Sequence, residues 1–536
     1  MEQATTKAPD SERALVSLET SERLSDSLVW RLQRESYTRR GDKAWLTDRV
    51  PYYVTSNTFI AGACARVVLG YLRDGLAAAD VDLDEPVYVV ELAGGSGQFG
   101  FLFLKKLLAC AREVPALARL RLRYVMTDLA PANVEAWRAR DSLKPFVDSG
   151  LLDFATFDLE RDTRIALVHS GETLVAGSLR NPLSVIAHYA FDSTAQDAFW
   201  VRAGNLHEGL VTTLSSREEP DLAEPELLTR LTTRYEQRPA RSDYYDDEAM
   251  NRVLASYRSR LGDTSFLFPI GALKGIRNLM ALAGDRLLLL SGDKGYTHED
   301  ELIARGDPQR TLHGGQCFSM MVNYHAIGLY FRERGGRALH AGTREKRLKV
   351  SAFLLGSAEN ACPETEAAFR REIDGFGPCE YYELASGFRK QLPAAPLDVI
   401  LALVKLGGWD PHLIFHFAGP LAEQARSAPE PLRHELLRTL ERCWEHFYPM
   451  DQDLPFELGR ICAALDRPAD ALRFYVESLK RYHEHPATLF NVGLCLYRLQ
   501  RPREALAFME RALGLNQGYA PAREWRVRIQ AELAGA

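Results

Sequence analysis

The chain has 536 residues, 46% of them hydrophobic and 26% charged, which is the composition of an ordinary globular protein long enough for several domains. Lysine and arginine number 66 and aspartate and glutamate 72, so the net charge of −6 gives no reason to expect nucleic acid or an anionic membrane as a partner. No apolar run is long enough to span a membrane and the N-terminus lacks the apolar core of a secretion signal, so we expect a cytoplasmic protein that binds neither membrane nor nucleic acid.

The first two segments are a polar N-terminus and an α/β domain. Residues 1–44 begin with a polar stretch of roughly 25 residues, which we expect to be loose, followed by a helix over Leu28–Arg40. Residues 45–355 alternate apolar strand patterns with helical ones, which predicts a Rossmann-like, doubly wound sheet. Its first strand is a β-branched run that begins at Val87 and ends at Glu91.

The glycine-rich stretch E-L-A-G-G-S-G ends that strand and precedes a predicted helix. Its glycines let the backbone turn tightly and approach a ligand, and the helix N-terminus directs free N–H groups into the turn. Such a turn holds a pyrophosphate in dinucleotide enzymes, holds the amino-acid part of S-adenosylmethionine (SAM) in class I methyltransferases, or joins strand to helix without a ligand. An acid directly before G-G-S-G resembles methyltransferase motif I. The resemblance implies that SAM is bound by Glu91, Ala93, Gly94, Gly95 and Gly97.

Further acids follow the next two predicted strands. Arg121–Asp128 ends in an acid placed to accept hydrogen bonds from ribose hydroxyls, although D-L-A-P-A-N is also a good helix start that Asp128 would cap. The strand Leu151–Phe157 is followed by Asp158. In SAM-binding folds an acid at this place often receives the adenine amino group, and Asp153 competes with Asp158 for that role.

A fourth strand is predicted in N-P-L-S-V-I-A-H-Y-A-F-D, with its core over Leu183–Ala187. The carboxyl ends of such strands face the ligand, so the residues that follow would face the methyl donor. His188 is a candidate general base near neutral pH, with a hydrogen-bonded loop histidine as the structural alternative. Tyr189 is a candidate wall of the methyl-transfer channel, and Asp192 completes the predicted catalytic set. Two further candidate bases come from a later segment, Tyr324 and His325.

A charged, tyrosine-rich insertion over residues 215–260 is predicted to form helices that cap the carboxyl edge of the sheet, where substrate selection usually resides. The last strand of the domain is predicted at Leu348–Gly356.

The order of these segments resembles the MidA-like methyltransferases, whose eukaryotic members include the mitochondrial arginine methyltransferase that acts on a complex I subunit. The family's V-I-A-N-E-F-F-D-A-like motif is matched by Val185–Ser193, and its late D-Y-G-Y-like segment by Asp293–Tyr296. The resemblance covers residues 45–345 and implies a class I methyltransferase fold with SAM as cofactor.

The chain departs from the family pattern in motif I and in the later strand. Ala93 replaces the first motif-I glycine and Gly94 replaces a proline, so the turn can differ in shape. The family's Asn-Glu pair is His188-Tyr189 here. Loss of that carboxylate weakens the inference of arginine methylation but leaves SAM binding in place.

Residues 356–392 are predicted to link this domain to a helical region over 393–536. Identical residues recur in that region at an offset of 34, and the clearest pairs are Gly459 with Gly493, Pro468 with Pro502, and Ala471 with Ala505. The period resembles the tetratricopeptide repeat (TPR), in which small residues let paired helices pack closely. Such repeats bind peptides or build oligomers, or they buttress a neighbouring domain.

Two functions therefore compete. The favoured one is a SAM-dependent methyltransferase acting on an N or O nucleophile of a peptide, protein or small metabolite, with the TPR-like region for recognition or dimerisation. The other is a catalytically inactive methyltransferase-like scaffold whose repeats bind protein partners. Methyl transfer from a sulfonium requires no metal, and the eight scattered cysteines, without a Cys-x-x-Cys pair, predict none.

Overall fold

The computed structural model describes residues 15–40, 53–112, 114–224, 226–314, 317–342, 348–356, 362–391 and 395–535. The chain divides into two compact units. The first combines Met1–Thr55, Cys64–Gly100 and Leu107–Phe376, and the second combines Ser56–Ala63, Phe101–Lys106 and Gly377–Ala536.

The first unit is built on a seven-stranded sheet with the order β17-β18-β12-β7-β2-β3-β4. The strands are β2 (Pro86–Leu92), β3 (Arg121–Asp128), β4 (Leu152–Thr156), β7 (Leu183–His188), β12 (Leu287–Asp293), β17 (Arg337–His340) and β18 (Lys349–Leu355). The five strands from β12 to β4 are parallel, and β18 is antiparallel to both of its neighbours. Along the chain the sheet grows from β2 to β4 and then restarts on the other side of β2 with β7. In open α/β sheets, ligands bind beyond the carboxyl ends of the strands at such a reversal.

The predicted α/β class is confirmed. The strands expected from Val87, over Arg121–Asp128, over Leu151–Phe157 and over Leu183–Ala187 are β2, β3, β4 and β7. Every residue of β2 after its first is at most 5% exposed, which explains why this strand reads as a continuous apolar run. The helices along this part of the chain are α1 (Leu28–Arg40), α3 (Thr58–Ala77), α4 (Gln98–Arg112), α5 (Pro131–Arg138), α6 (Lys144–Asp148), α8 (Glu248–Arg260), α9 (Ile270–Leu282), α10 (Tyr324–Glu333) and α11 (Pro363–Phe369).

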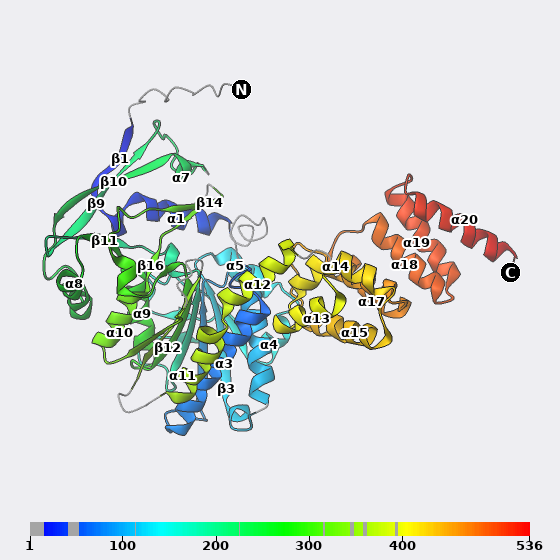
Figure 1. Cartoon of the computed structure of the whole chain (residues 1–536), viewed down its shortest axis with the longest axis horizontal. Helices are drawn as coiled ribbons and strands as arrows, with labels where there is room; N and C mark the ends of the chain where they lie inside the picture. Colours follow the sequence, from blue (N-terminus) through cyan, green and yellow to red (C-terminus); the bar gives the residue numbers. More distant parts are fainter. Residues whose placement is uncertain are drawn as a thin grey trace. The chain divides into compact units, whose positions relative to one another are not determined.

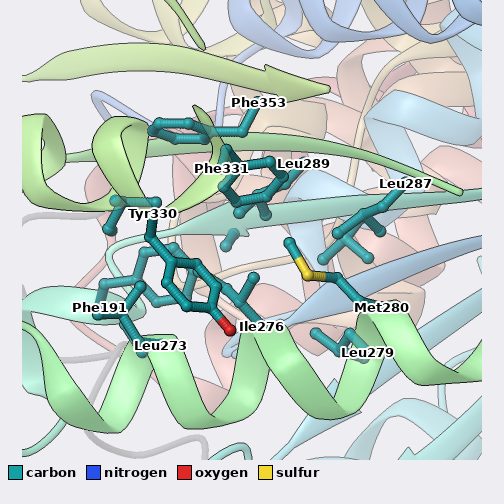
Figure 2. Packing of buried hydrophobic residues seen from close by; sticks show 14 of the residues in the cluster. Phe191, Leu273, Ile276, Leu279, Met280, Leu287, Leu289, Tyr330, Phe331 and Phe353 are labelled. Atoms are coloured by element: carbon teal, nitrogen blue, oxygen red, sulfur yellow. The ribbon is translucent and has the colours of Figure 1, made fainter. Parts of the chain in front are cut away.

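The largest core cluster brings together side chains from β12, β18, α9 and α10. Figure 2 shows Leu273 and Ile276 on α9 pointing toward the strands, where Leu289 of β12 lies near Phe331 of α10 and Phe353 of β18. All five side chains are fully buried. Because burying one such side chain stabilises a fold by about 1.5–3 kcal/mol, this cluster fixes the sheet on which the rest of the unit is built.

A second, five-stranded antiparallel sheet contains the strands labelled β1, β9, β10 and β11 in Figure 1. Its strands are β1 (Val16–Arg23), β8 (Asp197–Arg202), β9 (Asn205–Ser215), β10 (Leu231–Pro239) and β11 (Thr264–Phe268). The prediction of a helical cap over 215–260 is therefore wrong in its middle part, since β10 pairs with β9 from Leu231 to Pro239 and α7 (Leu227–Arg230) is one turn long. The expected loose N-terminus is also wrong for Val16–Arg23, which pairs with β9.

The helical prediction missed β10 because its sequence is charged as well as alternating. Burial alternates over the first half of β10, where Leu231 is buried and Thr232 exposed. Arg234, Glu236 and Arg238 then place charged groups on the exposed side of a strand, a pattern that also suits a solvated helix. The remaining short strands are β5 (Ile165–Ala166), β6 (Thr173–Leu174), β13 (Gly295–Tyr296), β14 (Thr311–His313), β15 (Cys317–Ser319) and β16 (Val322–Asn323).

The second unit is helical from residue 378 onward. Its helices are α12 (Pro378–Gln391), α13 (Leu397–Leu406), α14 (Pro411–Ala425), α15 (Glu430–Glu445), α16 (Leu454–Ala464), α17 (Pro468–Arg481), α18 (Pro486–Arg498), α19 (Pro502–Leu515) and α20 (Ala520–Gly535). None of the helices in the described ranges is long and apolar enough to cross a membrane.

The repeated residues of the sequence occupy equivalent places in two helix pairs. A Cβ on Gly459 of α16 would lie 2.6 Å from the Tyr475 ring of α17, and a Cβ on Gly493 of α18 would lie 2.8 Å from Cε of Met509 in α19. Tyr475 and Met509 are themselves 34 residues apart. Both glycines therefore allow close approach of the helix that follows.

Candidate functional site

A cleft opens at the carboxyl ends of β2, β3, β4 and β7, where the strand order reverses. We call it the donor cleft. Its lining is contributed by four strand ends and by α1. The residues at the strand ends are Leu92 and Ala93 at β2; Thr127, Asp128, Leu129, Ala130 and Asn133 at β3; Phe157, Asp158, Leu159 and Glu160 at β4; and Tyr189, Ala190, Ser193 and Thr194 at β7. The space within this lining, open solvent at its mouth included, is about 920 Å³.

The glycine turn, residues 93–97, is tied to the tip of β3. Gly94 N donates to Thr127 O over 2.9 Å, and Gly95 N donates to Oδ2 of Asp128 over 3.0 Å. Trp137 packs under the turn: its Nε1 donates to Gly95 O over 2.9 Å, and a Cβ on Gly94 would lie 3.0 Å from its ring. These bonds hold the turn in one conformation, and a side chain at position 94 would press against the Trp137 ring.

Three residues of this turn have left-handed backbone conformations. Gly95 and Gly97 have φ values of 52° and 80°, which glycine adopts without steric cost. Ala93 has a φ of 54° and lines the donor cleft. A non-glycine residue in this conformation carries strain of about 1–2 kcal/mol. The turn therefore keeps a glycine-like backbone at Ala93, where the resembling family has glycine.

Asp128 lies at the edge of the donor cleft with 8% exposure. Besides the bond from Gly95, its Oδ1 accepts from Ala130 N over 2.9 Å, so the carboxylate joins the glycine turn to the start of α5. Burial raises the pKa of Asp128, and its backbone donors act in the opposite direction. The side chain of Asn133 and the backbone of Leu129 also bond to this carboxylate, so its charge is held at the cleft edge by four protein donors.

Glu91 lies under the glycine turn and is 4% exposed. Its Oε2 accepts from Tyr124 OH over 2.9 Å and would lie 2.6 Å from a Cβ on Gly100. Burial raises the pKa of Glu91 to about 8, with the hydrogen bond from Tyr124 lowering it and the charge of Asp128 raising it. Of the residues predicted to bind the cofactor at this turn, Ala93 lines the cleft. Glu91, Gly94, Gly95 and Gly97 do not line it.

Asp158 and Glu160 lie at the β4 side of the donor cleft, and both are paired with Arg34 of α1. Asp153, the competing acid, accepts instead from His169 N and Ser170 N over 2.8 and 2.9 Å. It is 4% exposed and serves to anchor the loop after β5. Of the two candidates for an adenine-binding acid, the structure places Asp158 in the cleft lining.

His188 ends β7 with its side chain directed into the core. Its Nε2 lies 3.8 Å from Sγ of Cys64, its ring meets Phe99 edge-on with centroids 4.7 Å apart, and its buried Nδ1 has no hydrogen-bond partner. Burial lowers the pKa of His188 to about 3. The imidazole is thus neutral at physiological pH and separate from the donor cleft, whereas the next residue, Tyr189, lines it with a φ of 48°.

Asp192 connects to the cleft through a hydroxyl group. Ser193 lines the cleft, and its Oγ donates to Oδ1 of Asp192 over 2.9 Å. The hydroxyl of Tyr37 on α1 lies 3.4 Å from the same Oγ. Burial raises the pKa of Asp192 to about 6, with the Ser193 bond and the charge of Lys294 lowering it. Asp192 is therefore a carboxylate of nearly neutral pKa one hydrogen bond away from the cleft.

Asp293 is a second buried carboxylate, and the charge of Asp192 acts on it. Oδ2 of Asp293 accepts from Phe191 N over 3.1 Å and from Tyr324 OH over 3.3 Å, while its buried Oδ1 has no partner. Burial, and then the charge of Asp192, raise the pKa of Asp293 well above its usual range. The neutral form of Asp293 is therefore favoured more than that of an exposed aspartate. The other late candidate, His325, accepts from or donates to Tyr257 OH over 2.9 Å, apart from the cleft lining.

Sequence reasoning missed the contribution of α1. Trp30, Arg34 and Tyr37 line the donor cleft and are spaced four and three residues apart, which places them on one face of a helix. That spacing was the available signal. Nothing in the sequence connected this face with a site that begins more than fifty residues later.

No protein-family model matches the chain, and no curated protein sequence matches it. Two solved structures from Burkholderia thailandensis are partly similar. A COG1565 superfamily member bound to S-adenosyl-homocysteine is 14% identical with a TM-score of 0.37, and the match covers 59% of this chain and 80% of that one. An uncharacterized COG1565 superfamily protein is 13% identical with a TM-score of 0.38, and the match covers 63% and 89%. Superpositions at this level carry no argument about activity, so the function of this chain is argued from its own residues.

Proposed function

We propose that the chain is a SAM-dependent methyltransferase and that the donor cleft binds SAM. The observation that carries the proposal is the hydrogen bond between Gly95 of the glycine turn and Asp128, at the point where the strand order of the sheet reverses. A glycine turn beside a carboxylate that lines the cleft fits an amino-acid moiety and a ribose. The mixed apolar and acidic lining of the donor cleft fits a nucleoside with a positive sulfonium.

In this proposal the chain's residues act mainly by binding and alignment. The backbone at Ala93 would receive the amino-acid part of the donor, Asp128 the ribose hydroxyls and Asp158 the adenine amino group. When bound, SAM supplies a methyl group already activated by its sulfonium. Holding the acceptor in line with that methyl group is the larger part of the catalysis.

In this proposal Asp192 is the base that accepts the proton lost by the acceptor nucleophile. Its pKa of about 6 keeps the carboxylate mostly ionised at neutral pH yet basic enough to take a proton. Ser193, which lines the cleft and donates to Asp192, would pass that proton from the cleft to the carboxylate. Burial and the charge of Asp192 raise the pKa of Asp293, which favours its neutral form and so reduces repulsion between the two carboxylates. This arrangement suits an N or O nucleophile and takes the place of the carboxylate missing at Tyr189.

The repeated helix pairs of the second unit suit a recognition surface. We propose that they are TPR-like and bind a peptide or protein acceptor, or build a homodimer, while the donor cleft carries the reaction. A small-molecule acceptor would leave the repeats with the oligomerisation role alone.

The reaction is tested by incubating the full chain with methyl-labelled SAM and fractions of a cell extract, followed by mass spectrometry. A labelled peptide or metabolite supports the enzyme and identifies the acceptor. Tight binding of SAM without label in any fraction would instead favour the scaffold. The strained Ala93 and the absence of His188 from the cleft lining are compatible with that role.

A further inference from the structure

Among the contacts of helix α1, hydrogen bonds attach it both to β15 and to the loop after β4. The amide of Gln33 is paired with the backbone of Phe318 in β15: Oε1 accepts from Phe318 N over 2.9 Å, and Nε2 donates to Phe318 O. One residue later, Arg34 reaches the loop after β4, where NH1 pairs with Asp158 and NH2 donates to Glu160 over 2.5 Å. The two attachments use different elements, so α1 keeps one when the other is removed.

Both carboxylates that receive Arg34 are positioned by the protein backbone. Oε1 of Glu160 accepts from Ala195 N over 2.8 Å, and Oδ1 of Asp158 accepts from Glu160 N over 3.1 Å. Gly271 leaves room for this arrangement, because a Cβ there would lie 2.3 Å from Oε1 of Glu160. The acids are therefore fixed in place, and the guanidinium spans them with its two terminal nitrogens.

The three side chains are shielded from solvent, with exposures of 20% for Arg34, 17% for Asp158 and 19% for Glu160. Without Arg34, two neighbouring carboxylates would share this site. In the part of the chain that the structure describes, the other cation within 4 Å of them is Arg161, which is 72% exposed. Removing one partner of a shielded ion pair costs more than the pair itself contributes, because the remaining charge stays desolvated.

Arg34 lies where α1 covers the donor cleft. It is preceded by Trp30 and followed by Tyr37, both of which line the cleft on the same helix face. The acid that it neutralises, Asp158, is the one proposed to meet adenine. A shift of α1 away from the loop after β4 would therefore withdraw an aromatic wall and expose a carboxylate pair at the same time.

We propose that Arg34 is a positioning residue of the donor site: by bridging Asp158 and Glu160 it holds α1 over the cleft, so that Trp30 and Tyr37 form a wall against the bound donor. The inference rests on the proposed function, since it assigns to α1 a part in the retention of SAM. It adds that the N-terminal helix belongs to the catalytic unit.

The test compares three variants of the full chain. Arg34→Ala removes the bridge, and Arg34→Lys restores the charge but reaches one carboxylate at a time. Arg31→Ala is the matched control, because Arg31 is an exposed arginine on the same helix, one turn before Arg34. Gln33 is left in place to keep α1 attached to β15.

Two readouts are measured: the dissociation rate of S-adenosyl-homocysteine by stopped-flow fluorescence, and hydrogen exchange of the α1 amides in ligand-free protein. We expect Arg34→Ala to raise the dissociation rate about tenfold while the association rate changes less than about threefold, since such changes act mainly on dissociation. The α1 amides should exchange at least about tenfold faster, with the β2 and β3 amides unchanged, because only the attachment of one helix is lost. Arg34→Lys should recover part of both effects, and Arg31→Ala should match the wild type.

Equal dissociation rates and equal α1 exchange in Arg34→Ala and Arg31→Ala would overturn the proposal. Faster exchange across the whole sheet would overturn it too, because Arg34 would then be a general stability residue. Should the wild-type chain bind no S-adenosyl-homocysteine, the proposed function fails, and the exchange comparison alone then decides whether Arg34 holds α1.

Discussion

The backbone N–H of Gly95 donates to Oδ2 of Asp128 over 3.0 Å, joining the turn after β2 to the tip of β3. The two residues are 33 positions apart in the sequence; Gly95 follows β2, and Asp128 ends the neighbouring parallel strand β3. One carboxylate thus shapes the glycine turn and also faces the donor cleft, so a change at Asp128 should affect binding in two ways.

Asp128→Ala should weaken binding of S-adenosyl-homocysteine at least about 30-fold, because each hydrogen bond to a charged group contributes about 1.5–3 kcal/mol. Asp128→Asn, which keeps an acceptor oxygen, should lose less. Asp153→Asn is the control: it lies one strand away and anchors His169 and Ser170, so it should lower the thermal midpoint but not the affinity. Isothermal titration calorimetry measures the affinities. Equal losses for the 128 and 153 variants would count against the ribose assignment.

Ala93→Gly should be neutral or stabilise the first unit by up to about 1 kcal/mol, because strain at the left-handed residue is relieved at a smaller cost in unfolded-chain entropy. Ala155→Gly, in the buried strand β4, should instead destabilise it by about 1 kcal/mol. Thermal or urea unfolding of both variants gives the comparison. Destabilisation of the same size at both positions would mean that Ala93 is not strained.

The stability of the first unit should fall as the pH rises because of Glu91. Its pKa of about 8 in the folded chain lies above the ordinary value of 4.5, so the folded state holds a proton that the unfolded state releases between these values. The stability contribution is present at low pH and is lost as the pH rises from 4.5 to 8, with a slope of at most about 1.4 kcal/mol per pH unit. Glu91→Gln should flatten this slope in thermal midpoints measured from pH 5 to 8. Parallel slopes for the two proteins would exclude Glu91 as the source.

Methyl transfer should lose activity below about pH 6 as Asp192 becomes protonated. In single-turnover assays with an identified acceptor, Asp192→Asn should lower the rate constant about 100-fold and remove the acidic limb of the profile. His188→Asn should retain that limb, because burial lowers the pKa of His188 to about 3 and its side chain packs against Cys64. An acidic limb that disappears with His188 but persists without Asp192 would reverse the assignment.

The strands around the cleft could be predicted because each reads as a short, largely apolar run, and an acid ends or soon follows β2, β3 and β4. The face on which a side chain lies could not. Successive residues of a strand point to opposite faces, so the sequence places His188 and Tyr189 equally near the end of β7. Only the packed structure shows that the histidine meets Cys64 and Phe99 while Tyr189 lines the cleft.

The role of α1 could not be predicted from the sequence, for a different reason. The helix itself was predicted with its observed bounds from apolar periodicity. Its function depends on the ion pair between Arg34 and Asp158, which are 124 residues apart, and no local pattern encodes such a pairing. The second sheet was missed on similar grounds, since β1 is paired with a strand almost two hundred residues later.

Titration of S-adenosyl-homocysteine into the wild-type chain, Gly95→Arg and Gly262→Arg tests the central claim most directly. Gly95 has a φ of 52° within the glycine turn, whereas a side chain at Gly262 would meet open space. The account predicts binding to the wild type and to Gly262→Arg, and a loss of at least about 100-fold for Gly95→Arg, because its side chain would be strained and would fill the turn. Binding of equal strength by all three proteins would place the ligand elsewhere and contradict the account.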